Sequence, residues 1–528
     1  MQGSAQTNQT LGGLPYKWVV AIVVIFGIFM SVLDVTIVNI AIPRLQADFG
    51  APLYDVQWVA TGYTLAQGVA TPLTPFLSGL LGLKRFYLVL LALFTIGSAL
   101  CGLAWSLPVL IAFRILQGAG GASLLPMSYT LLYREFPPEE RGTAVGALGI
   151  PILLAPALGP TLGGYIVTSI GWPLIFYINL PIGIVGFVMG FFLLREFRPG
   201  ANSHFDLPGF VFSAAGTSAI LYAFSDLSTD GWGSTKVLSF LAAGILCLAI
   251  FVVVEMVTAS LGREPLLDIR LFTNAPFSVG NMAYILVVFA LFGGLFLVPV
   301  YLQNLRGLTA YEAGILLLPQ AFGSMMSVVV GGRLIDRIGV KLVIIPGLLF
   351  LSFALWRLSF VSLYTPFLQL QLLLFLNGLG VGLSIQPMTV ALLSDIKPKD
   401  LPQATSLYSV IRNITSSVGV AFLASLVQTQ TDIHYGHLAE QVTASSPAGA
   451  LLQQQIAFFM ARGAPSPQAA TAAAIQQLIQ LLQQQANMLA INDAFLLSMA
   501  ATIMAMVMVF LIPIRPRPKG TAKPVLTE

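Results

Sequence analysis

Two charged side chains interrupt stretches of the sequence that are otherwise apolar. Asp34 lies in the apolar run that begins near Trp18, and Arg114 lies in the run that begins near Leu107. Placing a charge at the centre of a membrane helix costs roughly 2.5–3.5 kcal/mol on insertion scales. Such residues usually bind a proton, an ion or a substrate, or pair with an opposite charge. Asp34 and Arg114 are therefore the first candidates for chemistry.

The composition identifies the elements that must hold these two residues. Of 528 residues, 57% are hydrophobic and 9% are charged, whereas a soluble domain has about 25% charged residues. So few charges cannot cover a soluble surface, and we expect an all-α integral membrane protein. The formal net charge of +4 is too small to indicate nucleic acid as a partner.

Apolar runs of about 20 residues predict fourteen transmembrane helices. They cover approximately residues 18–42, 54–77, 86–105, 108–133, 142–168, 173–195, 208–227, 237–258, 277–302, 311–331, 341–360, 365–393, 402–427 and 493–513. With a cytoplasmic N-terminus, 18 of the 25 Lys and Arg residues fall in cytoplasmic segments, 4 fall outside and 3 lie within helices. This bias supports both the count and the orientation, so both termini are expected in the cytoplasm.

Related sequences recur 261 residues apart in the chain. Gly121 corresponds to Gly382, and Pro126-Met127 corresponds to Pro387-Met388. The shift equals eight helices, which favours two pseudo-symmetric halves of six helices with two further helices inserted between them. Chance similarity between apolar segments is the alternative. The expected divisions are residues 1–200 for the N-terminal bundle, 201–272 for inserted helices 7 and 8 with their connector, and 273–528 for the C-terminal bundle.

Segment 428–492, in the C-terminal bundle, is a long outer connection rich in Gln and Ala. It contains helical patterns around 450–462 and 467–489, separated by a stretch with two prolines. Because Ala, Gln and Leu are good helix formers, we expect a helical hairpin. A disordered spacer is the alternative.

Asp34 and Arg114 are expected at similar depth in the outer half of the N-terminal bundle. Asp34 precedes Pro43 by nine residues, and Arg114 follows Leu107 by seven. At 1.5 Å per residue these positions lie about 13 Å and 10 Å below the outer surface. A polar network here can relay protons, whereas a static ion pair that joins the helices is the alternative. Thr36, Asn39, Gln117 and Gly118 are the further motif and network residues of this half. Arg412 and Asn413 are polar network candidates near the cytoplasmic third of the second half, where a structural role with an arginine that extends to the interface is an equal alternative.

Two segments are candidates for gating. Ala155, Gly159 and Gly163 form a small-residue ladder that permits close helix approach, and nearby prolines add bends. We expect a hinge-prone contact between the halves at Gly159, Pro160, Gly163 and Gly164. Gly332 to Lys341 predicts a tight cytoplasmic turn that acts as a latch: Asp336 accepts from a helix N-terminus and Arg337 stays solvated. Simple topogenic charge is the alternative explanation of this turn.

The candidates for substrate contact are large or polar residues on expected cavity faces, which core packing would also explain. They are Met30, Tyr63, Met127, Tyr284, Gln303 and Gln320. His434 and His437 lack carboxylate or Cys partners, so no metal site is expected. The sequence contains no P-loop and no Ser/His/Asp set, so neither an enzyme nor ATP-driven transport is expected, and no cofactor beyond a proton gradient.

Several motifs together resemble one family, the fourteen-span drug:proton antiporters of the EmrB/QacA type in the major facilitator superfamily. Leu33 to Pro43 resembles the family's first-helix motif, and Leu110 to Ala122 resembles its fourth-helix motif, whose arginine is implicated in proton coupling. Ala155 to Gly164 resembles the antiporter motif of the fifth helix. Further similar segments are Trp172 to Gly183 and Glu264 to Phe272.

The resemblance implies proton-driven efflux of amphipathic compounds from a bacterial inner membrane by alternating access. Segment 428–492 is closer to EmrB, which implies a periplasmic adaptor and, through it, an outer-membrane channel. No acid follows Leu81, so only Asp336 matches the family's loop motif, and the tenth helix lacks the carboxylate expected for dicationic substrates. Two alternatives stay open: proton-coupled uptake or export of a specific metabolite, and a membrane scaffold that transports nothing.

Overall fold

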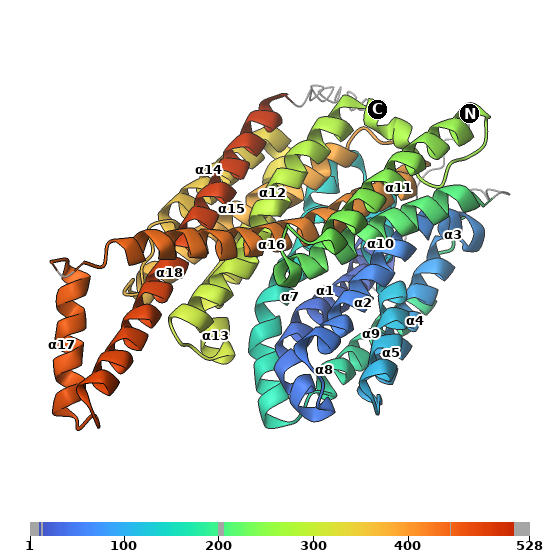
Figure 1. Cartoon of the computed structure of the whole chain (residues 1–528). Helices are drawn as coiled ribbons and strands as arrows, with labels where there is room; N and C mark the ends of the chain where they lie inside the picture. The colour runs from blue at the N-terminus through green and yellow to red at the C-terminus, as the bar shows by residue number, and fades with distance from the viewer. Residues whose placement is uncertain (1–9, 12–13, 199–204, 444, 512–528) are drawn as a thin grey trace, which may run out of the picture.

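The computed structural model describes residues 10–11, 14–198, 205–443 and 445–511 as an almost entirely helical protein (Figure 1). The described strands are β1 (Thr10–Leu11) and β2 (Leu14–Pro15), which pair antiparallel. The N-terminal bundle contains α1 (Tyr16–Phe49), α2 (Leu53–Ala70), η1 (Thr71–Leu73), α3 (Thr74–Leu81), α4 (Leu83–Gly102), α5 (Leu107–Gly121), α6 (Leu124–Glu135), η2 (Pro138–Glu140), α7 (Arg141–Ser169), α8 (Leu174–Tyr177) and α9 (Asn179–Leu193). α10 (Leu207–Asp230) and α11 (Thr235–Ser260) follow, in the segment predicted to hold the inserted helices. After η3 (Ile269–Thr273), the C-terminal bundle contains α12 (Ala275–Val300), η4 (Tyr301–Leu305), α13 (Ala310–Ile338), α14 (Val340–Leu358), α15 (Phe367–Leu393), α16 (Leu401–Glu440), α17 (Pro447–Ala461) and α18 (Pro467–Leu511).

Fewer segments than the fourteen predicted have the length and apolar composition of a membrane span. Within the described residues, 12 segments are long and apolar enough to cross a membrane, and a bent segment in η2 and α7 is a thirteenth candidate. The predicted second span is divided into α2, η1 and α3, with Pro72 and Pro75 at the starts of the last two. Because proline lacks a backbone N–H, it interrupts the helical hydrogen bonding there. A membrane protein with 12 to 13 candidate spans is therefore established, and fourteen is not.

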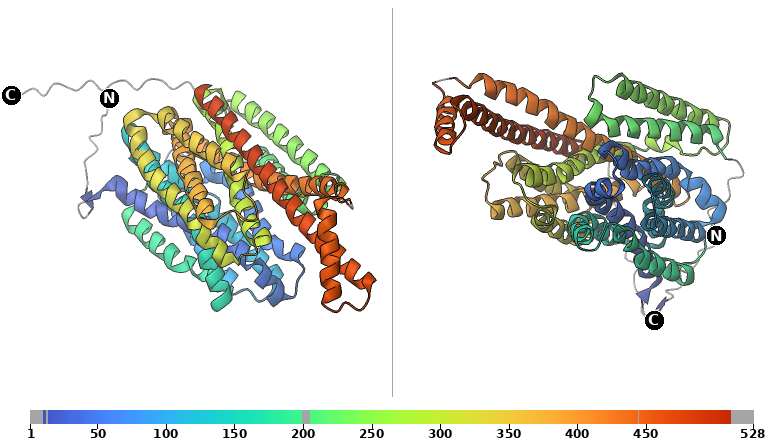
Figure 2. Two further views of the ribbon diagram at one scale, coloured as in Figure 1. Left: turned by 90° about the vertical axis from the view of Figure 1, so that its left-hand side faces the viewer. Right: turned by 60° about the horizontal axis from the view of Figure 1, so that its bottom comes forward.

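The two ends of the bundle differ in structure. α1 begins and α18 ends at one end, which we call the terminal face, and α16, α17 and α18 project beyond the opposite end, the hairpin face (Figures 1 and 2). α16 has 40 residues and α18 has 45, so they are roughly 60 and 68 Å long, against about 30 Å of hydrocarbon in a bilayer. The helical hairpin expected in segment 428–492 is confirmed, but its long helices continue without a break from the flanking spans.

The two bundles pack most closely where α7 meets α13 near the terminal face. A Cβ atom added to Gly332 would lie 2.7 Å from the backbone oxygen of Gly142, so both helices need glycine here. The prediction of a turn over residues 332–341 is wrong in extent, because α13 remains helical to Ile338. Only Gly339, with φ of 90°, separates α13 from α14. Gly332 was predicted to begin a turn, but it lies within α13 and allows close contact with α7.

Helices α10 and α11 lie side by side along the outside of the bundle (Figure 2, green). α10 packs against both α2 and α16, so it covers the seam between the two bundles on that side. The Thr61 and Ser225 hydroxyls, 3.2 Å apart, join α2 to α10. Asp206 caps the N-terminus of α10 by accepting from the Gly209 N–H.

Candidate functional site

Asp34 and Arg114 form an ion pair inside the N-terminal bundle. Arg114 Nη1 on α5 lies 2.5 Å from Asp34 Oδ2 on α1. The side chains are 1% and 0% exposed, so neither charge is compensated by bulk water. Charge compensation must come from the partner and from hydrogen bonds, since an isolated buried charge is very costly. The sequence predicted that Asp34 and Arg114 lie at similar depth, and in the structure the two side chains are in direct contact.

Two amides complete the surroundings of the Asp34 carboxylate. Gln117 Nε2 donates to Asp34 Oδ1 at 2.9 Å, and Asn179 Nδ2 donates to the same oxygen at 3.0 Å. Gln117 Oε1 accepts from Arg114 Nη1 at 2.7 Å, which orients the Gln117 side chain between the two charges. Asp34 thus accepts three hydrogen bonds from side chains of two other helices, α5 and α9. These donors replace the water that burial removes.

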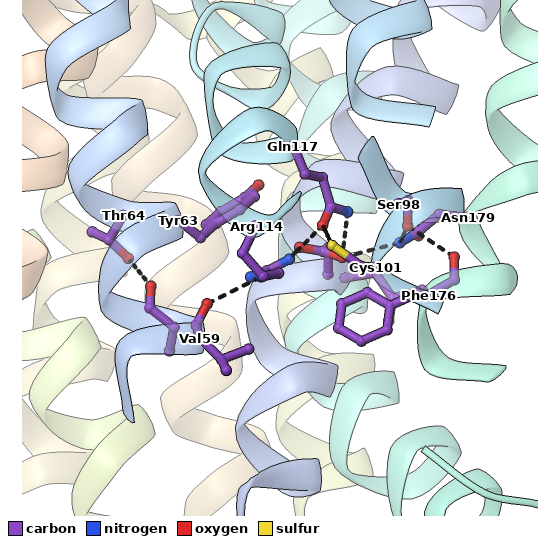
Figure 3. Close-up of polar contacts among 12 residues, drawn as sticks. Val59, Tyr63, Thr64, Ser98, Cys101, Arg114, Gln117, Phe176 and Asn179 are labelled. Atoms are coloured by element: carbon purple, nitrogen blue, oxygen red, sulfur yellow. Dashed lines mark hydrogen bonds and ion pairs between the residues drawn. The ribbon is translucent and has the colours of Figure 1, made fainter. Parts of the chain in front are cut away.

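A second layer fixes the orientation of Arg114 and Asn179 (Figure 3). Arg114 Nε donates to the backbone oxygen of Val59 at 3.1 Å, and the Tyr63 ring centre lies 4.1 Å from the guanidinium carbon. Asn179 Nδ2 also donates to the Ser98 hydroxyl at 3.1 Å, and Ser98 in turn donates to a backbone oxygen of α8. Such a connected polar network holds the ion pair in one geometry.

The sequence predicted part of this network and missed part of it. Gln117 is in contact with both charges, as its position three residues after Arg114 suggested. Asn179 and Ser98 were not assigned to the network. The available signal was an amide within an apolar span at Asn179, but only helix rotation decides which polar residue faces Asp34.

Other residues predicted for the network have different positions. Asn39 and Thr36 line the central cavity, and Thr36 Oγ1 donates to its own helix at Leu33 O, 2.9 Å away. Gly118 is a packing residue, because a Cβ there would lie 2.5 Å from the backbone oxygen of Tyr63. It allows α5 to approach α2 closely, which places Arg114 against Val59 of α2.

A cavity of about 720 Å³ lies between the two bundles. Arg114 and Tyr63 line it from the N-terminal bundle, and Tyr284, Gln320 and Arg412 line it from the C-terminal bundle. Its size and mostly apolar lining are typical of a site for an organic ligand. Asp34 lies behind this lining, and its charged partner Arg114 reaches the cavity. Arg114 therefore connects the buried Asp34 to the cavity wall.

Of the six candidate substrate residues, Tyr63, Tyr284 and Gln320 line the cavity. Met30 and Met127 are completely buried in the apolar core, and Gln303 lies in η4, outside the lining. The placement of the two methionines is wrong because an apolar helix has no polar face from which its rotation can be deduced. Arg412 and Asn413, assigned to the network, both line the cavity on α16.

Hydrogen bonds join the bundles between the cavity and the terminal face. Asp336 on α13 accepts from the N–H groups of Gly142 and Thr143 at 3.0 and 2.9 Å and from the Thr143 hydroxyl at 2.6 Å. Its carboxylate thus stands at the N-terminus of α7, where a negative charge is favourable. The contact predicted for Asp336 is present, and Arg337 beside it is exposed. Further pairs across this interface are Thr130 with Thr405, Tyr129 with Gln386 and Ser406 with the Thr71 backbone oxygen.

The small-residue ladder of α7 has a different partner from the one predicted. Cβ atoms at Gly159 and Gly163 would meet Thr36 and Ile37 of α1, in the same bundle. The expected contact of these two glycines with the other half is therefore wrong. Gly164 does face the C-terminal bundle, because a Cβ added there would lie 3.9 Å from the Tyr311 backbone nitrogen. The Pro160 side chain lies outside the described residues. Glycine spacing predicts close approach but not the partner helix.

Comparison with known proteins gives consistent similarities. The sequence matches the family described as Major Facilitator Superfamily over residues 24–420 and again over 281–517. Relatives include the uncharacterized MFS-type transporter YhcA of Bacillus subtilis, 30% identical over 90% of this chain and 89% of that one. The multidrug export protein EmrB of Haemophilus influenzae is 30% identical over 79% and 82%, and the riboflavin transporter RibZ of Clostridioides difficile is 32% identical over 78% and 88%. A solved proton:xylose symporter, XylE, has the same fold, with a TM-score of 0.59 and 13% identity over 94% and 95% of the two chains.

Proposed function

The chain belongs to the Major Facilitator Superfamily, and we propose that it is a proton-driven exporter of amphipathic compounds that works by alternating access. The observation that carries this proposal is the Asp34 carboxylate, completely buried and paired with an arginine that lines the central cavity. A carboxylate at such a position can bind one proton, and the change in charge is passed directly to the cavity wall. One relative is named a multidrug export protein, and another, from Mycobacterium tuberculosis, is named a multidrug resistance protein B homolog; both names support efflux of varied compounds.

The proton step follows from the charge balance at Asp34. A proton on this carboxylate removes the negative charge, and Arg114 is then left buried without a counter-ion. An uncompensated buried charge destabilises its site by roughly 3–5 kcal/mol. The side chain reduces this cost by turning towards the cavity, which it already lines. Protonation and substrate binding are thereby coupled through one guanidinium, and by linkage each changes the affinity for the other.

The conformational step involves the contacts near the terminal face. In the predicted orientation this face lies in the cytoplasm, so the hydrogen bonds of Asp336 and Thr130 close the cavity towards the cytoplasm. Each hydrogen bond contributes about 0.5–1.5 kcal/mol net, so a few of them suffice to set the population of the closed state. Opening separates α7 from α13 at Gly142 and Gly332, where the two backbones touch.

Everted membrane vesicles test this function. The experiment compares the parent with Asp34→Asn at matched expression and follows accumulation of a fluorescent compound under an imposed pH gradient. Asp48→Asn is the matched control, because Asp48 is on the same helix but forms an exposed pair with Arg44. We expect accumulation with the parent and the control, and none with Asp34→Asn. Accumulation by intact cells instead of everted vesicles would indicate uptake, and no substrate-dependent proton flux at all would indicate a scaffold.

We further propose that the projecting hairpin binds a periplasmic adaptor of the membrane-fusion class, in a bacterial inner membrane. Two exposed apolar side chains of α17, Leu451 and Phe458, are seven residues apart and so share one face of this projecting helix. Exposed apolar residues grouped on one element are typical of a protein-binding surface. Replacing α17 by a short Gly/Ser linker should abolish co-purification of a membrane-fusion adaptor from the same genome. Substrate-dependent proton flux should persist, and loss of both would show that the helix is needed for folding instead.

A further inference from the structure

Arg412 is a second arginine in the wall of the central cavity. It lies on α16, eleven residues after Leu401, so it is roughly 16 Å along the helix from its start near the terminal face. Its guanidinium carbon lies 5.9 Å from the centre of the Phe292 ring, and the side chain is half-buried. Unlike Arg114, it forms an ion pair with none of the carboxylates in the described part of the chain.

The charge of the cavity follows from its lining. Among the described side chains that line it, those with a full charge are Arg114 and Arg412, and none is Asp, Glu, Lys or His. Asp34 neutralises Arg114 from behind the wall. The cavity therefore carries one uncompensated positive charge, that of Arg412, in surroundings of low dielectric constant where charges interact strongly. A bound cation would be repelled, and a bound anion would supply the missing counter-charge.

The groups around Arg412 indicate the rest of such an anion. Asn413 and Ser416 supply polar atoms on the same helix, and Phe292 and Phe296 on α12 supply aromatic rings. A guanidinium binds a carboxylate or sulfonate through paired hydrogen bonds, and aromatic rings favour flat apolar ligands. Tyr284 also lines the cavity, and its hydroxyl accepts a hydrogen bond from the Tyr408 hydroxyl at 2.8 Å.

We propose that the compound carried by this protein is an amphipathic aromatic monoanion whose acid group binds Arg412. This inference rests on the proposed function, and it adds a consequence for the driving force. If one proton enters for each monoanion that leaves, two elementary charges move inward per cycle. Export is then driven by the membrane potential as well as by the pH gradient, whereas exchange of a proton for a monocation would move no net charge.

Two probes with one skeleton test the assignment. 8-Anilinonaphthalene-1-sulfonate is an aromatic monoanion, and N-phenyl-1-naphthylamine is nearly the same molecule without the sulfonate. Binding of each is measured by calorimetry with the full-length protein in nanodiscs, and the signal of empty nanodiscs is subtracted. In Arg412→Gln, we expect the affinity ratio of anion to neutral probe to fall about tenfold or more, since hydrogen bonds to a charged group contribute that much. Arg412→Lys should restore most of the ratio, and Arg357→Gln, an arginine of α14 outside the cavity lining, should leave it unchanged.

An unchanged ratio in Arg412→Gln, or an equal loss in Arg412→Lys and Arg412→Gln, would overturn the assignment. Proteoliposomes clamped with valinomycin and potassium give a second readout. We expect an inside-negative potential alone to raise export of the anionic probe more than that of the neutral probe; equal stimulation of both would contradict the proposal. Asp34→Asn separates this proposal from the proposed function: it should abolish proton-driven transport of both probes, and it should not lower the binding ratio, because it adds the uncompensated charge of Arg114 to the cavity wall.

Discussion

The ion pair between Asp34 and Arg114 makes a quantitative prediction about stability. Asp34→Asn removes the negative charge and leaves Arg114, 1% exposed, with only neutral acceptors at Gln117 and Val59. Arg114→Gln leaves the Asp34 carboxylate with the two amide donors of Gln117 and Asn179. Breaking a buried ion pair from one side costs roughly 3–5 kcal/mol, because the other charge stays buried and uncompensated.

The double variant Asp34→Asn/Arg114→Gln should be less destabilised than the two single variants together. It loses the charge-assisted hydrogen bonds but leaves no stranded charge, so its cost should be about that of one single variant. The coupling free energy then equals the cost of one single variant, about 3–5 kcal/mol, at or above the upper end for residues in contact. The exposed pair of Arg44 and Asp48, at 3.1 Å on α1, is the matched control, and its coupling should be about 0.3–0.5 kcal/mol.

Reversible unfolding in mixed detergent micelles, followed by tryptophan fluorescence, measures these differences in the free energy of unfolding. The reasoning would be refuted if the loss of unfolding free energy in the double variant equalled the sum of the losses in the two single variants to within about 0.5 kcal/mol. Such additivity would mean that the two charges do not compensate each other in the membrane, and the proton step derived from their contact would fail with it.

Three further predictions concern the surroundings of the ion pair and the closure near the terminal face. Asn179→Ala removes a buried donor to Asp34, so the free energy of unfolding should fall by about 1–3 kcal/mol; an unchanged value would mean that this bond contributes nothing. Asp336→Asn removes a negative charge from the N-terminus of α7, and this charge stabilises the closed state by about 1 kcal/mol. The open state should therefore be populated roughly fivefold more, as measured from the distance between spin labels at Glu139 and Lys397. An identical distance distribution in the parent and the variant would contradict the latch. Gly332→Val should abolish transport without unfolding the protein, because a Cβ at this position would lie 2.7 Å from the backbone oxygen of Gly142. Gly436→Ala is the control and should leave transport unchanged, because nothing lies within 4 Å of a Cβ added there. Normal transport by Gly332→Val would show that α7 and α13 need not touch.

The sequence predicted those features that depend on single residues or on depth along a helix. A charge within an apolar run is visible directly, and depth follows from counting residues, so Asp34 and Arg114 were assigned to one layer. The hairpin could be expected from helix-forming residues alone. Features that depend on helix rotation could not be derived, because a helix that is apolar all round has no directional signal. Ser98 and Asn179 were missed for this reason.

The same limit explains the errors in packing. The glycines of α7 were correctly associated with close contact, but Gly159 and Gly163 contact α1 and the earlier glycine Gly142 contacts α13. Which neighbour occupies a small-residue groove is decided by the arrangement of all the helices, which no single segment contains. The division of the second span at Pro72 is a further case, because two Thr-Pro pairs in an apolar run are compatible with either a kink or a break.

Proton coupling at Asp34 is tested most directly by two assays on one variant in proteoliposomes. Asp34→Asn and the parent are compared in exchange of labelled for unlabelled substrate, which needs no proton movement, and in uphill transport driven by a pH gradient. We expect the variant to retain exchange, because Asp34 lies behind the cavity wall, and to lose uphill transport completely. Uphill transport by Asp34→Asn that equals that of the parent would contradict the assignment of the proton to this carboxylate.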